Sequence, residues 1–233
     1  SELQARVDSG DKAGQPGASE PATVAERPDR QKDAGNAEPG GEKRSRFSQL
    51  SKTVSACRKC KLGAGRKNAV FGVGNPDADL VFIGEAPGAV EDDTGKPFVG
   101  PAGRVLTEEL AKNGITRDEV FICNIIKCRP PGNRDPLPDE IEACEPYLLE
   151  QLEILKPKML CGLGRYAVAT LLKHPIFIMK IRGTWERYHD LPLFVCLHPS
   201  AVLHQPNNRP LFDVDIATLA KAYHARNQQP ASS

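Results

Sequence analysis

Seven cysteines are the first residues of the chain that could do chemistry, and four of them have the spacing of metal ligands. Cys57 and Cys60 form a CxxC pair, and Cys128 and Cys144 form a wider pair, at the start of a loop and on a predicted helix. Four thiolates that begin with a CxxC pair suit Zn²⁺ or an iron–sulfur cluster. Because the CxxC pair precedes the first predicted strand, a thioredoxin-like redox dithiol is disfavoured. Spacing alone leaves zinc and a cluster both open.

The other three cysteines, Cys123, Cys161 and Cys196, each fall inside an apolar run. We expect them to be small buried hydrophobic residues of the core. An odd number of cysteines without a preceding export signal also disfavours a disulfide framework.

The elements that must position these residues alternate along the chain. Continuously apolar runs predict buried strands over residues 78–83, 120–126, 158–162 and 193–197. Helical patterns cover residues 104–113, 138–155, 165–172 and 211–226, a short helix runs from about residue 47 into Cys57, and 185–188 fits an edge hairpin. This order predicts an α/β fold: three layers, α/β/α, with a central, mostly parallel four-stranded sheet.

Polar or glycine-rich residues follow each of these strands. Residues 84–88 follow the first strand, Asn124 ends the second, residues 162–164 follow the third, and His198 follows the last. In parallel sheets, ligands bind where the carboxyl ends of the strands meet. The sequence therefore predicts a site at that edge.

Composition divides the chain into a folded domain and two flanks. Residues 1–46 are rich in Gly, Pro, Ala and charged residues and poor in large apolar ones, which predicts a disordered tail. We expect the domain to cover residues 47–227 and a disordered end to cover 228–233. The tail lacks the pattern of a signal or transit peptide, and no run is long enough to span a bilayer. With a net charge of +1, nucleic-acid binding would require a local patch.

Four ordered blocks resemble the family 4 uracil-DNA glycosylases. They are GEAPG at residues 84–88 with Glu91-Asp92, GKPFVGPAGR at 95–104, NIIKCRPP at 124–131 with Asn133-Arg134, and HPS at 198–200. The match runs from about Cys57 to Tyr223. The resemblance implies a uracil-DNA glycosylase-like fold and a base excision repair enzyme. Such an enzyme flips uracil out of single- or double-stranded DNA and hydrolyses its N-glycosidic bond, leaving an abasic site. It also implies a monomer in the cytoplasm of a bacterial or archaeal cell, without a membrane partner.

The resemblance also selects between the two metal hypotheses. The family carries a [4Fe–4S] cluster on a CxxC pair and a second, wider pair, which places the cluster on Cys57, Cys60, Cys128 and Cys144. Its implied role is structural: it orders loops near the DNA.

The implied base pocket combines stacking, recognition and catalysis. Phe98 would stack on the base, Asn124 would offer a donor and an acceptor to uracil N3 and O4, and His198 would donate a hydrogen bond to O2. Glu85, Ala86 and Pro87 would complete the uracil site. Ala86 stands where better-known uracil glycosylases have Asp, so we expect the catalytic carboxylate to be Glu85, with Glu91 also implicated. The remaining histidines, His174, His189, His204 and His224, are predicted to be surface or packing residues.

Loops around the pocket are expected to contact DNA. Leu203 is a candidate wedge for the space of the extruded base, and the candidates for backbone contact are Ser200, Lys127, Arg129, Arg134 and Arg209. A solvated loop is the simpler interpretation of the basic residues. Relatives that bond covalently to DNA carry an inserted basic, His-containing loop where this chain has residues 129–134, so we expect hydrolysis with turnover.

Three other hypotheses remain open at this point. The first is a zinc-stabilised nucleic-acid-binding module without catalysis. The second is an iron–sulfur protein that binds nucleotides or a protein partner through a degenerate pocket, which the joint presence of Phe98, Asn124 and His198 disfavours. The third is a glycosylase that also accepts other deaminated bases. A partner-binding role for the N-terminal tail is open as well.

Overall fold

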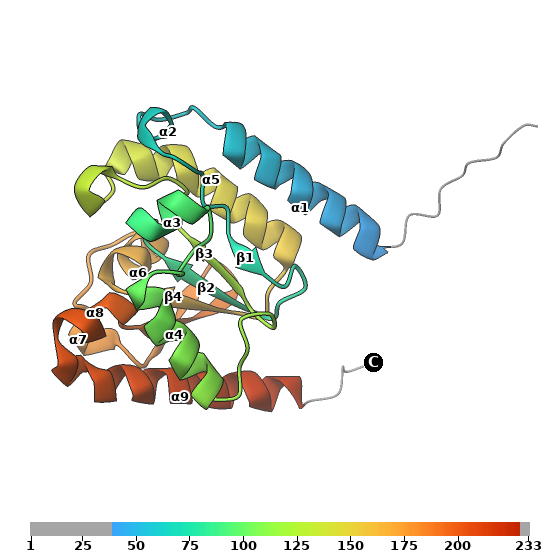
Figure 1. The fold of residues 1–233 in the computed structure, drawn as a ribbon. Coiled ribbons are helices and arrows are strands. Elements are labelled where there is room, and N and C mark those ends of the chain that lie inside the picture. Colours follow the sequence, from blue (N-terminus) through green and yellow to red (C-terminus); the bar gives the residue numbers. More distant parts are fainter. Residues whose placement is uncertain (1–38, 229–233) are drawn as a thin grey trace, which may run out of the picture. The chain divides into compact units, whose positions relative to one another are not determined.

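The structure is a computed structural model that describes residues 39–228 of the 233-residue chain. Its helices are α1 (Pro39–Ala56), α2 (Leu62–Gly65), α3 (Ala89–Thr94), α4 (Pro101–Lys112), α5 (Pro138–Leu155), α6 (Arg165–Leu172), α7 (Ile178–Ile181), α8 (Pro199–His204) and α9 (Arg209–Asn227) (Figure 1). Its strands are β1 (Val73–Gly74), β2 (Leu80–Gly84), β3 (Phe121–Asn124), β4 (Met159–Leu163), β5 (Trp185–Tyr188) and β6 (Leu191–Cys196). Short 3-10 turns cover Pro131–Asn133 and Pro206–Asn208.

Helix α1 begins earlier than the domain boundary predicted from composition. It starts at Pro39, so residues 39–46 are helical, whereas residues 1–38 of the predicted tail and residues 229–233 lie outside the described residues. The Lys43 ammonium donates to the Asp77 carboxylate at 2.7 Å and to the Leu155 carbonyl at 3.1 Å. Composition cannot reveal such long-range contacts.

The sheet has six strands in the order β1-β3-β2-β4-β6-β5. Strands β3, β2, β4 and β6 are parallel, and β1 and β5 pair antiparallel at the two edges. The predicted parallel strands and the edge hairpin at β5 are therefore confirmed, but the predicted total of four strands is too small. Strand β1 could not be predicted, because it has only two residues, one of them glycine, and so short a segment shows no alternation of apolar and polar residues.

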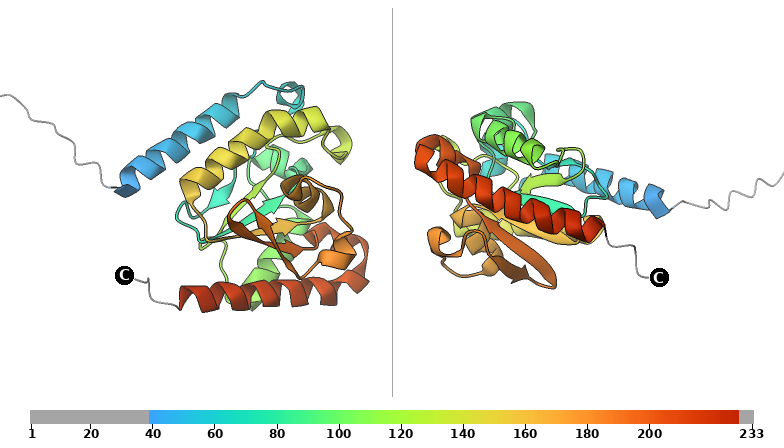
Figure 2. Two further views of the ribbon diagram at one scale, coloured as in Figure 1. Left: turned by 180° about the vertical axis from the view of Figure 1, so that it is seen from behind. Right: turned by 90° about the horizontal axis from the view of Figure 1, so that it is seen from below.

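Helices cover both faces of the sheet, as predicted. Helices α1, α5 and α6 pack on one face, and α4, α8 and α9 pack on the other (Figures 1 and 2). Strand β2 serves both layers because its side chains alternate: Val81 and Ile83 face α5, whereas Leu80 and Phe82 face α4 and α9.

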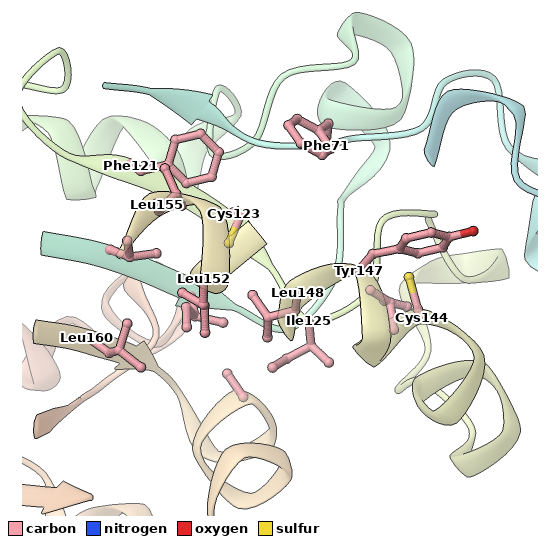
Figure 3. Close-up of a cluster of buried hydrophobic side chains, with 14 of the residues drawn as sticks. Phe71, Phe121, Cys123, Ile125, Cys144, Tyr147, Leu148, Leu152, Leu155 and Leu160 are labelled. Atoms are coloured by element: carbon pink, nitrogen blue, oxygen red, sulfur yellow. The ribbon is translucent and has the colours of Figure 1, made fainter. Parts of the chain in front are cut away.

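The layer under α5 is a dense apolar core. Figure 3 shows Phe121, Cys123 and Leu160 of the strands meeting Leu148 and Leu152 of α5. Each fully buried side chain of this size contributes about 1.5–3 kcal/mol relative to its exposed state. As predicted, the remaining two strand cysteines, like Cys123, are fully buried: Cys161 and Cys196 each have 0% exposure.

The strand order creates a crevice at the carboxyl edge of the sheet. The chain passes from β2 to β3 on one side and then returns across α5 to β4 on the other side of β2. The loops after β2 and β4 therefore diverge, and ligands bind at such points in α/β sheets. No helix within residues 39–228 combines the length and apolar character needed to cross a membrane.

Candidate functional site

A pocket of about 670 Å³ opens at this edge, a size that suits a small organic ligand. Its walls come from the loops after β2, β3, β4 and β6. Of the predicted base-binding, catalytic and DNA-contacting residues, it brings together Glu85, Ala86, Pro87, Glu91, Phe98, Asn124, Arg134, His198, Ser200 and Leu203.

Asn124 ends β3 at the floor of the pocket, with 1% exposure. Its Oδ1 is buried without a hydrogen-bond partner within residues 39–228. An unpaired buried amide oxygen costs about 1–3 kcal/mol, so a native protein usually retains one for a purpose. Gly84, the neighbour of Asn124 across the sheet, makes room: a Cβ there would lie 2.4 Å from Oδ1 and 2.5 Å from the Phe98 ring.

Phe98 forms the wall beside Asn124. Its backbone is left-handed, with φ of 51°, a conformation that costs a bulky residue about 1–3 kcal/mol. The ring is 6% exposed, and its centroid lies 5.6 Å from that of the His198 imidazole. Gly103 of α4 sits directly on the Phe98 carbonyl, since a Cβ there would lie 1.9 Å from that oxygen.

His198 caps the N-terminus of α8, and this contact fixes its tautomer. Its Nδ1 accepts the Ser200 backbone N–H at 3.1 Å and lies 2.6 Å from the Ser200 hydroxyl. Because Nδ1 accepts, the proton of the neutral ring resides on Nε2. Burial lowers the pKa of His198 to about 4, so the ring is neutral at pH 7. Ser200, predicted as a DNA contact, thus orients the imidazole.

The two candidate carboxylates have different surroundings. Burial raises the pKa of Glu85 to about 7; the Asp135 carboxylate adds to the rise and Arg165 opposes it. Glu91 Oε1 instead accepts the backbone N–H groups of Val99 at 3.0 Å and Gly100 at 2.8 Å. Glu91 therefore shapes the loop that carries Phe98, and Glu85 is the freer of the two.

The predicted phosphate contact at Lys127 is wrong. This residue is 1% exposed, and its ammonium donates to the Asn124 carbonyl at 2.7 Å and to Gln151 Oε1 at 2.5 Å. A buried lysine whose donors are used inside the domain cannot reach a DNA backbone.

The other predicted basic contacts are largely occupied. Arg134 lines the pocket but bonds both oxygens of the Glu140 carboxylate, at 2.9 and 2.7 Å. Arg209 pairs with Asp213 and Glu109. Arg129 donates to the side chain of Asn133 at 2.7 Å. By contrast, Leu203 is 47% exposed on α8, as a wedge residue would be.

Sequence reasoning missed Arg165 and Tyr166, which line the pocket at the start of α6. Arg165 is exposed and makes no ion pair within the described part of the chain. Its guanidinium lies 4.3 Å from the centroid of the Tyr166 ring. The sequence did contain a signal for them: a basic residue followed by an aromatic one, directly after the glycine-rich end of a strand.

The four predicted ligand cysteines line a second, small cavity between the end of α1, the loop after β3, and α5. Donors already face three of the sulfurs. Cys144 Sγ accepts the Lys127 backbone N–H at 3.2 Å, Cys57 Sγ accepts that of Lys59 at 3.4 Å, and Arg66 donates to Cys128 Sγ at 2.8 Å. Such donors favour thiolates.

The four cysteines line this cavity from three parts of the chain, which are the end of α1, the loop after β3, and α5. Within residues 39–228, no three Cys, His, Asp or Glu side chains have the arrangement of ligands to a single metal ion. A zinc site would hold its thiolates about 2.3 Å from one centre. Four cysteines around one cavity, three of them facing hydrogen-bond donors, are the donor set that an iron–sulfur cluster takes.

Comparisons with known proteins show the family of the chain. Residues 71–220 match the family model of the uracil DNA glycosylase superfamily. The chain is 44% identical over 186 residues to the type-4 uracil-DNA glycosylase of Saccharolobus solfataricus, covering 76% of this chain and 86% of that protein. It is 41% identical to the type-4 enzyme of Archaeoglobus fulgidus (75% and 92% covered) and 44% identical to that of Thermotoga maritima (68% and 84%). The chain therefore belongs to the uracil DNA glycosylase superfamily and, within it, to the type-4 uracil-DNA glycosylases.

Proposed function

We propose that the chain removes uracil from DNA by hydrolysing its N-glycosidic bond, as a base excision repair enzyme. The observation that carries this proposal is the buried Oδ1 of Asn124, which has no partner among residues 39–228 and faces the same pocket as the Phe98 ring and the neutral His198. An extruded base that stacks on Phe98 would bring its polar edge to this oxygen.

Asn124 would provide the recognition. Uracil N3–H can donate to Oδ1, and the Asn124 amide can donate to uracil O4. Cytosine has no N3–H and carries an amino group in place of O4, so in this orientation of the amide it would leave Oδ1 unpaired. A site built to satisfy a buried polar atom rejects the base that cannot do so.

His198 and Glu85 would provide the chemistry. Cleavage places negative charge on uracil O2 and positive charge on the sugar. The Nε2–H of neutral His198 would stabilise the first charge. The Glu85 carboxylate would stabilise the second charge and orient the attacking water. A pKa of about 7 leaves a large ionised fraction at neutral pH.

The rim of the pocket would hold the DNA strand, single or double. Leu203 would fill the space of the extruded nucleotide. Arg165, a cation of the pocket lining without an ion pair in the described residues, would contact a backbone phosphate in place of Lys127. We expect a monomer that acts in the interior of a bacterial or archaeal cell, where its DNA substrate lies.

Cys57, Cys60, Cys128 and Cys144 would hold a [4Fe–4S] cluster. Two backbone N–H groups and one guanidinium directed at the sulfurs support this assignment. When bound, the cluster supplies a structural cross-link between the end of α1, the loop after β3, and α5, and no electron for the cleavage.

Incubation of the full chain with a single-stranded oligonucleotide that contains one deoxyuridine tests the proposal. We expect free uracil and an abasic site, and no base release from the matched strand that carries cytosine at the same position. Absence of uracil release from chain that contains four irons per molecule would overturn the function. The same assay on a hypoxanthine-containing strand tests the wider base range. A colourless protein that contains zinc would overturn the cluster assignment.

A further inference from the structure

Arg117 lies outside every block that carries the family resemblance, yet it contacts the wall of the base pocket. It stands in the loop between α4 and β3. Its Nη1 donates to the Phe98 carbonyl at 3.0 Å and to Thr107 Oγ1 at 3.0 Å, and its Nη2 donates to the Pro97 carbonyl at 2.9 Å. One half-buried guanidinium thus joins two consecutive carbonyls of the stacking loop to α4.

These carbonyls belong to the strained part of the loop. Phe98 has a left-handed backbone that a bulky residue rarely adopts unless its surroundings enforce it. The turn directs the carbonyls of Pro97 and Phe98 toward the same group, and the planar fork of a guanidinium can bond both at once. A lysine ammonium at this position lacks the paired, coplanar donors.

The same conformation places the ring in the pocket. The Phe98 ring packs over Gly84 beside Asn124 and close to His198, whereas its carbonyl is enclosed by Gly103 and Arg117. A return of Phe98 to an ordinary backbone conformation would rotate its carbonyl away from Arg117 and its ring away from the base.

We propose that Arg117 is a positioning residue for base stacking: it holds Phe98 in the left-handed conformation that presents the ring to an extruded base. This inference rests on the proposed function, because it assumes that Phe98 stacks on the base. Arg117 is not one of the residues that line the pocket, and its bonds run to the loop of Phe98 and to α4, so we expect it to act through Phe98.

A double-mutant cycle tests this route. We expect Arg117→Met to lower the kcat/KM for uracil release by about 10- to 100-fold in the otherwise native chain. In the Phe98→Ala background the same change should cost less than about threefold, because the ring it positions is gone. Equal losses in the two backgrounds would show a role independent of Phe98 and overturn the inference.

Two further variants keep the test decisive. Thr107→Val removes one acceptor of Arg117 but neither loop carbonyl, and we expect uracil release within about threefold of the native rate. If Arg117→Met does not fold, Arg117→Lys takes its place in the cycle. We expect Arg117→Lys to retain part of the native rate of uracil release. Native-like uracil release by a folded Arg117→Lys and a folded Arg117→Met would also overturn the inference.

Uracil release by the native chain distinguishes a failure of the proposed function from a failure of the positioning role. If it releases no uracil, the proposed function fails. If it releases uracil and the cycle shows equal losses, the function stands and the positioning role fails.

Discussion

The base pocket and the cysteine cavity are two polar sites in one domain, but their polar groups are satisfied differently. In the pocket, Asn124 Oδ1 has no partner within the described residues, and Phe98 is held in a strained conformation. In the cavity, donors face the sulfurs of Cys57, Cys128 and Cys144.

The polar groups of the base pocket are available to a ligand, whereas three sulfurs of the cysteine cavity already accept hydrogen bonds from neighbouring parts of the fold. The pocket groups cost stability until a base binds, as is common at active sites. The cavity cysteines come from separate elements, and Cys144 of α5 also packs in the core between that helix and the sheet (Figure 3). Substitutions in the pocket should therefore remove chemistry and spare the fold, whereas substitutions in the cavity should do the reverse.

The largest expected effect is on stability, from Cys144→Ser. Loss of one ligand should release the iron and lower the free energy of unfolding by more than about 3 kcal/mol, because metal binding contributes directly to folding. Iron content and thermal unfolding measure this. Cys161→Ala is the control, since Cys161 is fully buried in the other apolar layer, with α4 and α9, and does not line the cysteine cavity; it should retain iron. A Cys144→Ser chain with full iron and native stability would contradict the assignment.

The next effect is on catalysis, from His198→Ala. Loss of the Nε2–H donor should lower the kcat for uracil release by about 10²- to 10³-fold. The melting temperature should fall by only a few degrees, the cost of losing the cap of α8. Ser200→Ala removes the hydroxyl beside Nδ1 but keeps the backbone N–H that donates to it, and we expect a loss of about tenfold or less. If His198→Ala kept the native kcat, His198 would not be the oxyanion donor.

A pH profile distinguishes the two titratable groups of the pocket. The kcat/KM should rise with pH through an apparent pKa of about 7, because only the ionised form of Glu85 can stabilise a cationic sugar. His198, with a pKa of about 4, stays neutral across this range and adds no inflection above pH 5. Glu85→Gln should remove the inflection and lower the rate at high pH. An unchanged inflection in that variant would assign the titration to another group.

The smallest expected effect concerns the rim. Arg165→Gln should reduce the slope of log K against log salt for DNA binding by about one, the change expected for one lost phosphate contact. Arg226→Gln removes the same charge near the amino ends of the strands, at the opposite edge of the sheet, and should leave the slope unchanged. Equal slopes for Arg165→Gln and the native chain would exclude Arg165 as a phosphate contact.

The sequence predicted the features that depend on local patterns. The parallel strands are continuously apolar, and helix 165–172 matches α6 residue for residue. Pocket residues that follow strand ends, such as Asn124 and His198, could be placed because topology brings those ends together.

Features that depend on distant contacts could not be predicted. Lys127 sits in a basic run that favours a solvated loop, yet its ammonium is buried against Gln151 of α5. Arg117 carries no motif, and its role depends on a carbonyl of Phe98 in another loop. In both residues the decisive partner is set by packing and not by neighbouring sequence.

Thermal unfolding with and without free uracil tests the central claim most directly. The claim is that Asn124 Oδ1, which has no partner in the described part of the chain, binds the polar edge of uracil. Millimolar uracil should raise the melting temperature of the native chain, and it should not raise that of Asn124→Ala, whose stability without uracil should equal or exceed the native value. An equal uracil-dependent rise in both proteins would contradict the account.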